Sequence, residues 1–132
     1  MRGYHGNIEQ LTLANANFRQ VLYTAKNSQL VLMSLQAGEE IGEEIHKESD
    51  QFFRFEAGHG QAIVDGNEYD VGDGDVVIVP AGSNHNVINT SSVEPLKLYT
   101  LYLPAHHKDG VVHVTKEQAL ADDEEFDGVT SE

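Results

Sequence analysis

Two segments decide the fold: GEEIGEEIHKESDQFFRFEAG from Gly38 to Gly58, and GDVVIVPAGSNHNVIN from Gly74 to Asn89. Each segment begins with a turn-forming residue and contains others further along. Each also has a histidine beside residues that favour strands. Valine, isoleucine and phenylalanine favour extended structure, whereas glycine and proline mark the turns that end it. The two segments therefore predict short strands joined by tight turns.

Working outward from these segments, runs of strand formers recur along most of the chain. Such short strands, separated by turns every eight to twelve residues or so, are typical of an all-β sandwich or barrel. The apolar run at 76–79 favours a strand buried on both faces. The expected strands are 18–24, 29–36, 44–48, 51–56, 61–65, 67–71, 76–79, 85–89 and 96–103.

The two ends of the chain differ in character from this middle part. Residues 1–16 are polar and mixed and predict an irregular arm. Thr115-Lys116-Glu117-Gln118 resembles a capping box and predicts a short helix from about Lys116. We expect one domain over residues 1–132, with a barrel core at about 18–104 and a C-terminal extension at 105–132.

Composition limits the classes of partner. The chain of 132 residues has a formal net charge of −14, which would repel nucleic acid and anionic membranes. Such a charge is most simply a device for solubility, and the acidic run at 122–127 predicts a solvated helix face or a tail. The chain has no cysteine, no apolar signal-peptide core and no membrane-length apolar stretch, so we expect a cytoplasmic protein.

Strand parity suggests a metal site. Side chains alternate between the two faces of a strand, so Glu44 and His46 point the same way. If the faces that carry Glu44, His46, Gln51 and His85 line a barrel, two imidazoles and two oxygen donors converge on one point. The neighbours expected to keep water from one side of that point are Phe53, Phe55 and Val87.

The spacing of these residues resembles the two-part metal-site signature of the cupin family, over Gly38 to Leu103. The first part is Gly38, five residues, Glu44-Ile45-His46, four residues, Gln51, six residues and Gly58. The second is Gly74, five residues, Pro80-Ala81-Gly82, two residues, His85, three residues and Asn89. The resemblance implies a double-stranded β-helix barrel, often dimeric, whose metal is usually held by three histidines and a glutamate. Asn89 is expected to hold a neighbouring loop.

The chain departs from this family pattern at two ligand positions. Glu44 stands where the family usually has its first histidine, and Gln51 stands where it usually has glutamate. The expected ligand set of Glu44, His46, Gln51 and His85 therefore keeps one negative charge but has two nitrogen and two oxygen donors. This set favours one divalent ion per chain from among Mn²⁺, Fe²⁺ and Zn²⁺ over copper. The alternative is a cupin without metal, in which Glu44 and Gln51 form hydrogen bonds in a polar cavity.

Three functions fit this prediction. The first is a metal-dependent enzyme that acts on a small polar molecule as an isomerase or lyase, with Glu44 or a bound water moving protons. The chain is similar to phosphomannose-isomerase-like cupins. A phosphosugar substrate is disfavoured because Lys47 and Arg54 have the wrong parity to face the cavity. The second is an Fe(II) dioxygenase that uses Glu44, His46 and His85. The third is a non-catalytic module that binds a small ligand.

Other features admit weaker predictions. Phe52 and the apolar strand at 96–103 are expected to leave apolar side chains exposed unless a second copy of the chain buries them, which predicts a homodimer. His59 lies in a Gly-His-Gly turn and is expected to be exposed. His106, His107 and His113 follow the last long strand, where they are ordinary loop residues, bind a surface metal or cover the barrel mouth.

Overall fold

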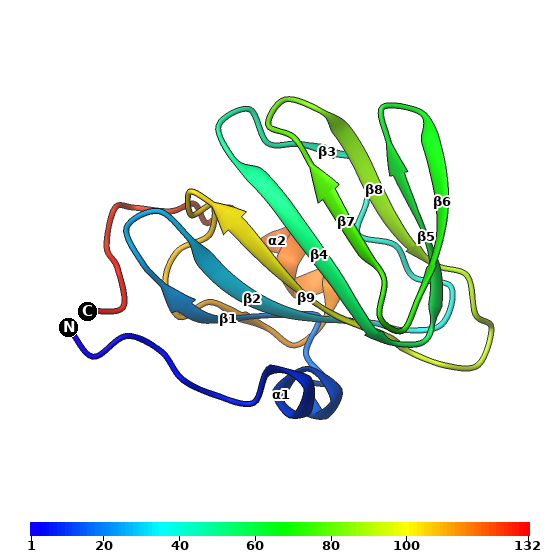
Figure 1. The fold of residues 1–132 in the computed structure, drawn as a ribbon, viewed down its shortest axis with the longest axis horizontal. Helices are drawn as coiled ribbons and strands as arrows, with labels where there is room; N and C mark the ends of the chain where they lie inside the picture. The colour runs from blue at the N-terminus through cyan, green and yellow to red at the C-terminus, as the bar shows by residue number, and fades with distance from the viewer.

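Two antiparallel sheets form the body of the protein (Figure 1). The structure is a computed structural model, and it describes all of residues 1–132. Its elements are α1 (Ile8–Ala14), β1 (Arg19–Thr24), β2 (Gln29–Leu35), β3 (Glu44–Ile45), β4 (Asp50–Ala57), β5 (His59–Val64), β6 (Asn67–Gly72), β7 (Val76–Val79), β8 (Asn84–Asn89), β9 (Leu96–Leu103), β10 (Val112–His113) and α2 (Lys116–Ala121).

The larger sheet has the strand order β10-β1-β2-β9-β4-β7, and the smaller has the order β3-β8-β5-β6. Every pairing in both sheets is antiparallel. Neighbours in the sheets are often far apart in the chain, as β2 and β9 are, because the chain crosses repeatedly from one sheet to the other. This topology and the two facing sheets confirm the all-β, double-stranded β-helix barrel that the sequence predicts.

The core lies between the two sheets and follows strand parity. In β4, Phe53 and Phe55 are 1% and 0% exposed, whereas Phe52 and Arg54 are only half-buried on the opposite face. Phe53 pairs with Thr100 of β9 and with Val77 of β7, so one row of the barrel interior crosses three strands. The alternation of faces along the sequence therefore predicts correctly that the Phe53 and Phe55 rings lie inside the barrel.

Helix α1 contradicts the irregular arm expected for residues 1–16. Its N-cap is Asn7, whose Oδ1 accepts a hydrogen bond from the backbone N–H of Gln10 at 3.0 Å. The expected C-terminal helix is confirmed as α2, with Thr115 as its N-cap. Neither helix is long and apolar enough to cross a membrane.

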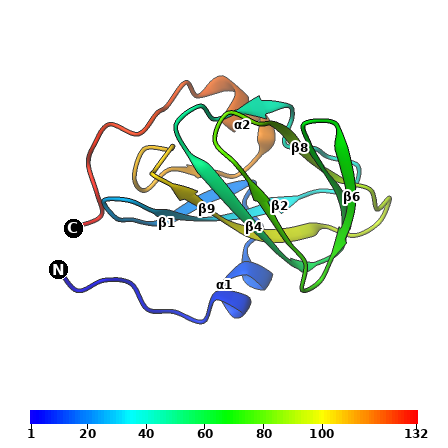
Figure 2. The same cartoon turned by 45° about the horizontal axis from the view of Figure 1, so that its top comes forward.

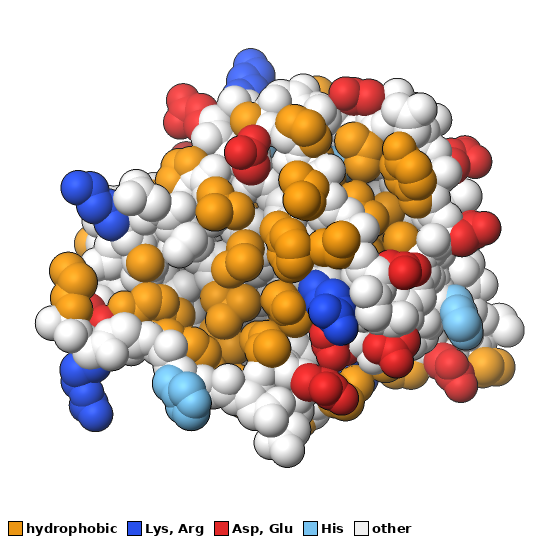
Figure 3. Space-filling model, in the orientation of Figure 1, with side chains coloured by type: hydrophobic (Ala, Val, Ile, Leu, Met, Phe, Trp, Pro, Cys, Tyr) orange, Lys and Arg blue, Asp and Glu red, His pale blue; other side chains and the backbone are white.

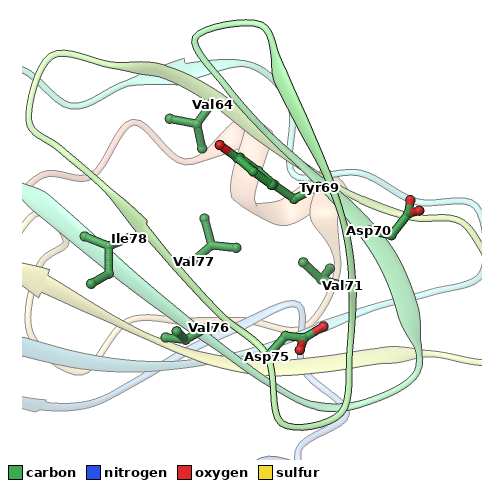
Figure 4. Close-up of a pocket in the computed structure, with 8 residues that line it drawn as sticks. All are labelled: Val64, Tyr69, Asp70, Val71, Asp75, Val76, Val77 and Ile78. Atoms are coloured by element: carbon green, nitrogen blue, oxygen red, sulfur yellow. The ribbon is translucent and has the colours of Figure 1, made fainter.

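Strand β7 contradicts the prediction of a strand buried on both faces. It is the edge of the larger sheet, and Val76 and Ile78 are 49% and 63% exposed. Between β7 and β6, the edge of the other sheet, lies a hollow of about 420 Å³ (Figure 4). Val64 and Tyr69 line one side of it, and Val76, Val77 and Ile78 line the other. This hollow shares no lining residue with the expected metal ligands.

The outer face of the larger sheet is apolar. Cross-strand pairing places Leu30, Leu101, Phe52 and Ile78 in one continuous row over β2, β9, β4 and β7. The Phe52 and Tyr99 rings lie on this face with their centroids 6.3 Å apart. Figure 3 shows hydrophobic side chains gathered over the part of the molecule where these strands face the viewer. We call this row of four residues the outer apolar row.

Candidate metal centre

Glu44 and His46 come from β3 and the turn that follows it. Strand β3 has only two residues, and the chain bends immediately after His46 instead of continuing to residue 48 as expected. The side chains still meet: His46 Nε2 and Glu44 Oε2 are 2.9 Å apart. His46 is 8% exposed, whereas Glu44 is half-buried at the rim. The shared direction of the two side chains agrees with the parity of their positions.

His85 reaches the same point from β8. Its Cα lies opposite that of Glu44 in the β3–β8 pairing, so the two side chains are direct cross-strand neighbours. The His85 Nδ1 lies 3.0 Å from the carbonyl oxygen of Ser83, to which it donates a proton. This bond leaves Nε2 as the free ligand atom, the arrangement in which a second residue orients a metal-binding histidine. The ligand atoms of Glu44, His46 and His85 all lie within 4.8 Å of one another.

Gln51 lies beside this cluster from β4 and is 2% exposed. Its Nε2 donates to Thr100 Oγ1 at 3.0 Å, which turns its Oε1 toward His85 Nε2 at 3.1 Å. The side chain is therefore anchored with its carbonyl oxygen directed at the ligand atom of His85. A role for Gln51 as a fourth ligand stays a prediction; the histidine and carboxylate groups that come together here are those of Glu44, His46 and His85.

The donor set fits a divalent cation. Bonds from such an ion to nitrogen or oxygen are about 2.0–2.2 Å long, so two ligands on one ion lie roughly 3–4 Å apart. The ligand atoms lie within 4.8 Å of one another, so small side-chain shifts would bring them into that range. Two imidazoles and one carboxylate suit Fe²⁺, Mn²⁺ and Zn²⁺.

Electrostatics favour the metal-binding protonation states of Glu44 and His85. Burial alone would raise the pKa of Glu44, but the hydrogen bond from His46 and nearby positive charges lower it overall. Burial lowers the pKa of His85, and its bond to Ser83 only partly opposes that effect. An ionised carboxylate and a neutral imidazole are the forms that coordinate a cation. The Phe53 ring, with its centroid 6.2 Å from that of His85, excludes water from one side.

Three of the remaining histidines make contacts that the sequence did not reveal. The ring of His106 packs against that of His46 with centroids 4.1 Å apart, and it makes no hydrogen bond. His107 Nδ1 lies 2.9 Å from Glu124 Oε2, and its Nε2 lies 3.2 Å from the Tyr102 hydroxyl. Of the predicted alternatives, His106 and His107 cover the barrel mouth. His113 lies apart from them, and its Nε2 is 2.9 Å from Asp122 Oδ2.

The acidic segment 122–127 is neither a helix face nor wholly solvated. Helix α2 ends at Ala121, and the segment after it lies at the same end of the barrel as β3 (Figure 2). The Glu124 side chain is 9% exposed in its pair with His107. Phe126 and Glu125 line a hollow of about 330 Å³ together with His46, Ser49 and His106. The acidic run thus forms one wall of the entrance to the candidate metal centre.

Lys47 also lines this entrance, although strand parity placed it elsewhere. It lies in the turn after β3, where the alternation of a strand no longer applies, and it is exposed. Arg54 does lie on the outer face, paired with Glu56 at 3.2 Å. His59 is exposed as expected, but it is the first residue of β5 instead of part of a turn. Asn89 confirms its expected role, since its Nδ2 donates to the carbonyl oxygens of Leu35, Gln36 and Glu94.

Acid is expected to destabilise the metal-free protein through His106. Burial and the neighbouring His46 and His107 lower the pKa of His106 from 6.5 to about 4. Between these two values the unfolded chain binds more protons than the folded one, so the free energy of unfolding falls as the pH falls. Because His106 is partly exposed, we expect a loss of only about 1–2 kcal/mol from pH 7 to pH 4.

Urea unfolding of chelator-treated protein at several pH values measures this effect. The His106→Gln variant is expected to lose less stability in acid than the parent chain, and His59→Gln, at an exposed position, is expected to behave like the parent. Equal pH slopes for the parent chain and His106→Gln would show that His106 does not titrate as expected.

The family model of the cupin domain matches residues 31–102 of this chain. A Bacillus subtilis protein, YrkC, is 47% identical over 87% of the chain, and the chain spans 64% of the length of that relative. The protein L612 of Acanthamoeba polyphaga mimivirus is 40% identical over 88% of the chain and 74% of its own length. The crystal structure of BH2720 from Bacillus halodurans superposes with a TM-score of 0.89 at 42% identity, and covers 92% of this chain and 96% of that one.

Proposed function

The chain belongs to the cupin family, and on that premise we propose that it is a metal-dependent enzyme that acts on a small polar molecule as an isomerase or lyase. The observation that carries the proposal is the convergence of Glu44, His46 and His85. We assign these three residues and Gln51 to a single divalent ion. The hollow of about 330 Å³ beside them has the volume of a small-ligand pocket.

The residues of the centre have distinct roles in this proposal. A divalent ion bound there would polarise a carbonyl or enediol oxygen of the substrate and acidify a bound water. Glu44 stays ionised because its pKa is lowered overall despite burial, so its carboxylate can accept a proton from the substrate. His106 and Ser49 line the hollow beside the metal ligands, so they would contact a substrate that enters it. Phe53 and Val87, 1% and 2% exposed, keep bulk water from the far side.

A metal-defined activity screen tests the proposal. The purified chain is loaded with Mn²⁺, Fe²⁺ or Zn²⁺, its metal content is measured, and it is incubated without oxygen with a panel of sugars, sugar acids and oxo acids. Proton NMR is expected to show isomerisation or elimination of at least one compound, and Glu44→Gln is expected to remove that turnover. Fully loaded protein that converts no member of the panel would contradict this function.

An oxygenase is the second candidate, and one observation favours it. Glu44, His46 and His85 by themselves bring two histidines and one carboxylate together. That combination leaves coordination positions open on Fe²⁺ for O₂ and substrate. Oxygen uptake by Fe²⁺-loaded protein across the same panel distinguishes the two chemistries, because an isomerase or lyase consumes none.

A non-catalytic ligand-binding module is the third candidate. Protein purified without metal that retains a tightly bound, unreacted small molecule would favour it over both enzymes. Mass spectrometry of the denatured protein after gentle purification identifies such a molecule. The screen for turnover then reports whether the same molecule is altered.

We also propose that two copies of the chain pair through the outer apolar row. Leu101 lies at its centre, in register with Leu30 and Phe52 on the neighbouring strands. A carboxylate introduced there would be buried without a partner in a dimer, so Leu101→Glu is expected to give monomers in sedimentation. Val93→Glu, at a position that is 82% exposed in a loop, is the matched control. A parent chain that sediments as a monomer would contradict the proposal.

A further inference from the structure

The two histidines of the candidate metal centre are held in different ways. A hydrogen bond orients the His85 ring, since its Nδ1 lies 3.0 Å from the carbonyl oxygen of Ser83. The only side-chain hydrogen bond of His46 joins its Nε2 to Glu44 Oε2 at 2.9 Å, and an ion would engage both of these groups. Metal-binding histidines usually have their other ring nitrogen held by a further residue. His46 has no such bond, so its orientation beside an ion depends on packing.

Two rings pack against His46 at the barrel mouth. The His106 ring has its centroid 4.1 Å from that of His46, with 55° between the two planes. The Tyr102 ring meets His46 edge-on, with the centroids 5.5 Å apart and the planes at 78°. Tyr102 and His106 also stack on each other, with centroids 5.4 Å apart and 27° between the planes. The three rings form one packed group, so a rotation of His46 would displace its neighbours.

The Tyr102 ring is fixed by a chain of hydrogen bonds that reaches the acidic C-terminal segment. Tyr102 is 1% exposed, and its hydroxyl lies 3.2 Å from His107 Nε2, while His107 Nδ1 lies 2.9 Å from Glu124 Oε2. Burial raises the pKa of Glu124, but hydrogen bonds from His107 and the Lys108 backbone lower it overall. The ionised carboxylate can only accept, so His107 Nδ1 donates to it. His107 Nε2 therefore accepts the hydroxyl proton of Tyr102.

The backbone of the loop that carries His106 is fixed from two sides. Gln29 of β2 is fully buried, and its Oε1 accepts hydrogen bonds from the backbone N–H groups of His106 at 3.2 Å and of His107 at 3.0 Å. The carbonyl oxygen of His106 accepts a hydrogen bond from the backbone N–H of Phe126 at 3.0 Å. The His106 ring itself makes no hydrogen bond, so its fixed backbone and the rings around it set its place against His46.

We propose that Tyr102 and His106 are positioning residues that hold the His46 ring in the orientation in which it binds the metal, and that Glu124 stabilises this arrangement through His107. Metal–ligand distances vary by only about 0.2 Å, and a rotating imidazole meets that condition only part of the time. Order that exists before binding lowers the entropic cost of binding. This role rests on the proposed metal centre, whereas the order of the His46 ring is a property of the chain alone.

Carbon-13 relaxation of the histidine rings tests this order in the chelator-treated full chain, without any metal. The chain has seven histidines, and His46→Asn identifies the His46 ring signals by their loss. In the parent chain the His46 ring is expected to be as rigid as that of His85. In Tyr102→Leu and in His106→Leu it is expected to gain motion on the picosecond-to-nanosecond timescale. A His46 ring that is mobile in the parent chain, or equally rigid in both variants, would overturn the proposal.

A competition titration with Zn²⁺ and a chromophoric chelator measures the consequence for metal binding. Tyr102→Leu is expected to raise the dissociation constant about tenfold or more, as the loss of an outer support of a metal ligand commonly does. Tyr99→Leu is the matched control, because Tyr99 lies in the same strand but on the outer face, beside Phe52. Equal dissociation constants for the two variants would overturn the positioning role. His106→Leu, at a half-buried position, decides the matter if Tyr102→Leu does not fold.

A second pair of variants measures the contribution of the C-terminal segment. Glu124→Ala removes the bonds to His107 and to the backbone N–H of Lys108. It is expected to raise the Zn²⁺ dissociation constant and the motion of the His46 ring, both by less than Tyr102→Leu does. Asp123→Ala removes a carboxylate from the exposed neighbouring position and is the control for charge. Identical results for Glu124→Ala and Asp123→Ala in both measurements would overturn the role of Glu124.

The relaxation and titration measurements let the two proposals fail separately. A chain that takes up no Zn²⁺, but whose His46 ring loses order in Tyr102→Leu, would reject the metal centre and retain the positioning of His46 by its neighbours. Tight Zn²⁺ binding with equal dissociation constants in the parent chain, Tyr102→Leu and His106→Leu would retain the metal centre and reject the positioning role.

Discussion

The double variant His46→Ala, His85→Ala is expected to contain no stoichiometric metal after it is loaded and desalted. The two imidazoles supply both nitrogen donors of the candidate centre, and their ligand atoms lie within 4.8 Å of each other and of Glu44. One carboxylate and one neutral amide cannot hold a divalent ion against dilution in buffer, because tight sites for these metals need three or four protein ligands. Elemental analysis of the untagged protein reports the occupancy and the identity of the metal together.

Controls separate the loss of ligands from the loss of fold. His59→Ala removes an exposed imidazole in β5 and is expected to keep the full metal complement. Circular dichroism of the double variant is expected to match the parent chain, because the apolar core around Phe55 and Leu98 is untouched. A full metal complement in the double variant would place the metal elsewhere and reject the centre proposed for Glu44, His46, Gln51 and His85.

The largest loss of stability is expected for Gly58→Ala. Gly58 joins β4 to β5 with φ at 93°, and an added Cβ would lie 2.5 Å from the carbonyl oxygen of Pro95. The three nearest atoms, Pro95 O, Leu96 Cα and Pro95 C, all belong to the backbone, so none can move aside cheaply. The left-handed conformation and the clash together are expected to lower the free energy of unfolding by about 3 kcal/mol. Urea unfolding at neutral pH measures the change.

Gly82→Ala is the matched control for this substitution. Gly82 also has a positive φ, 87°, but no atom lies within 4 Å of the position its Cβ would occupy. Only the backbone strain remains, and reduced freedom of the unfolded chain offsets part of it, so we expect a loss of about 1 kcal/mol or less. Equal losses for the two variants would show that the close approach of Pro95 to Gly58 does not matter.

The convergence of Glu44, His46 and His85 was predictable in part from local geometry and in part from the family spacing. Glu44 and His46 are two residues apart, and alternation along an extended chain sets their common direction over that distance. His85 follows the Pro80-Ala81-Gly82 turn, and its place in β8 opposite Glu44 agrees with the spacing. The first relation depends on neighbouring residues, whereas the second joins strands 41 positions apart and was predictable only because the spacing resembles that of the cupin family.

The entrance to the site was not predictable, because residues far apart in the chain form it. His106 packs on His46 across sixty positions of sequence, and Glu124 reaches His107 from beyond α2. A run of acidic residues looks the same in the sequence whether water or a histidine faces it. Similarly, the segment Val76 to Val79 looks in the sequence like a strand buried on both faces. In the structure its apolar side chains lie on the outer face and line the hollow beside β6.

The sequence by itself determined the barrel, the direction of its strand faces and the positions at which Glu44, His46, Gln51 and His85 enter it. Only the tertiary structure decided that the Tyr102 and His106 rings pack against His46, and that the acidic C-terminal segment lies over the mouth. The physical reason is that parity and turn chemistry act between neighbouring residues. The packing of a ring and the pairing of a charge, in contrast, depend on every element around them, and these are known only once the sheets have closed.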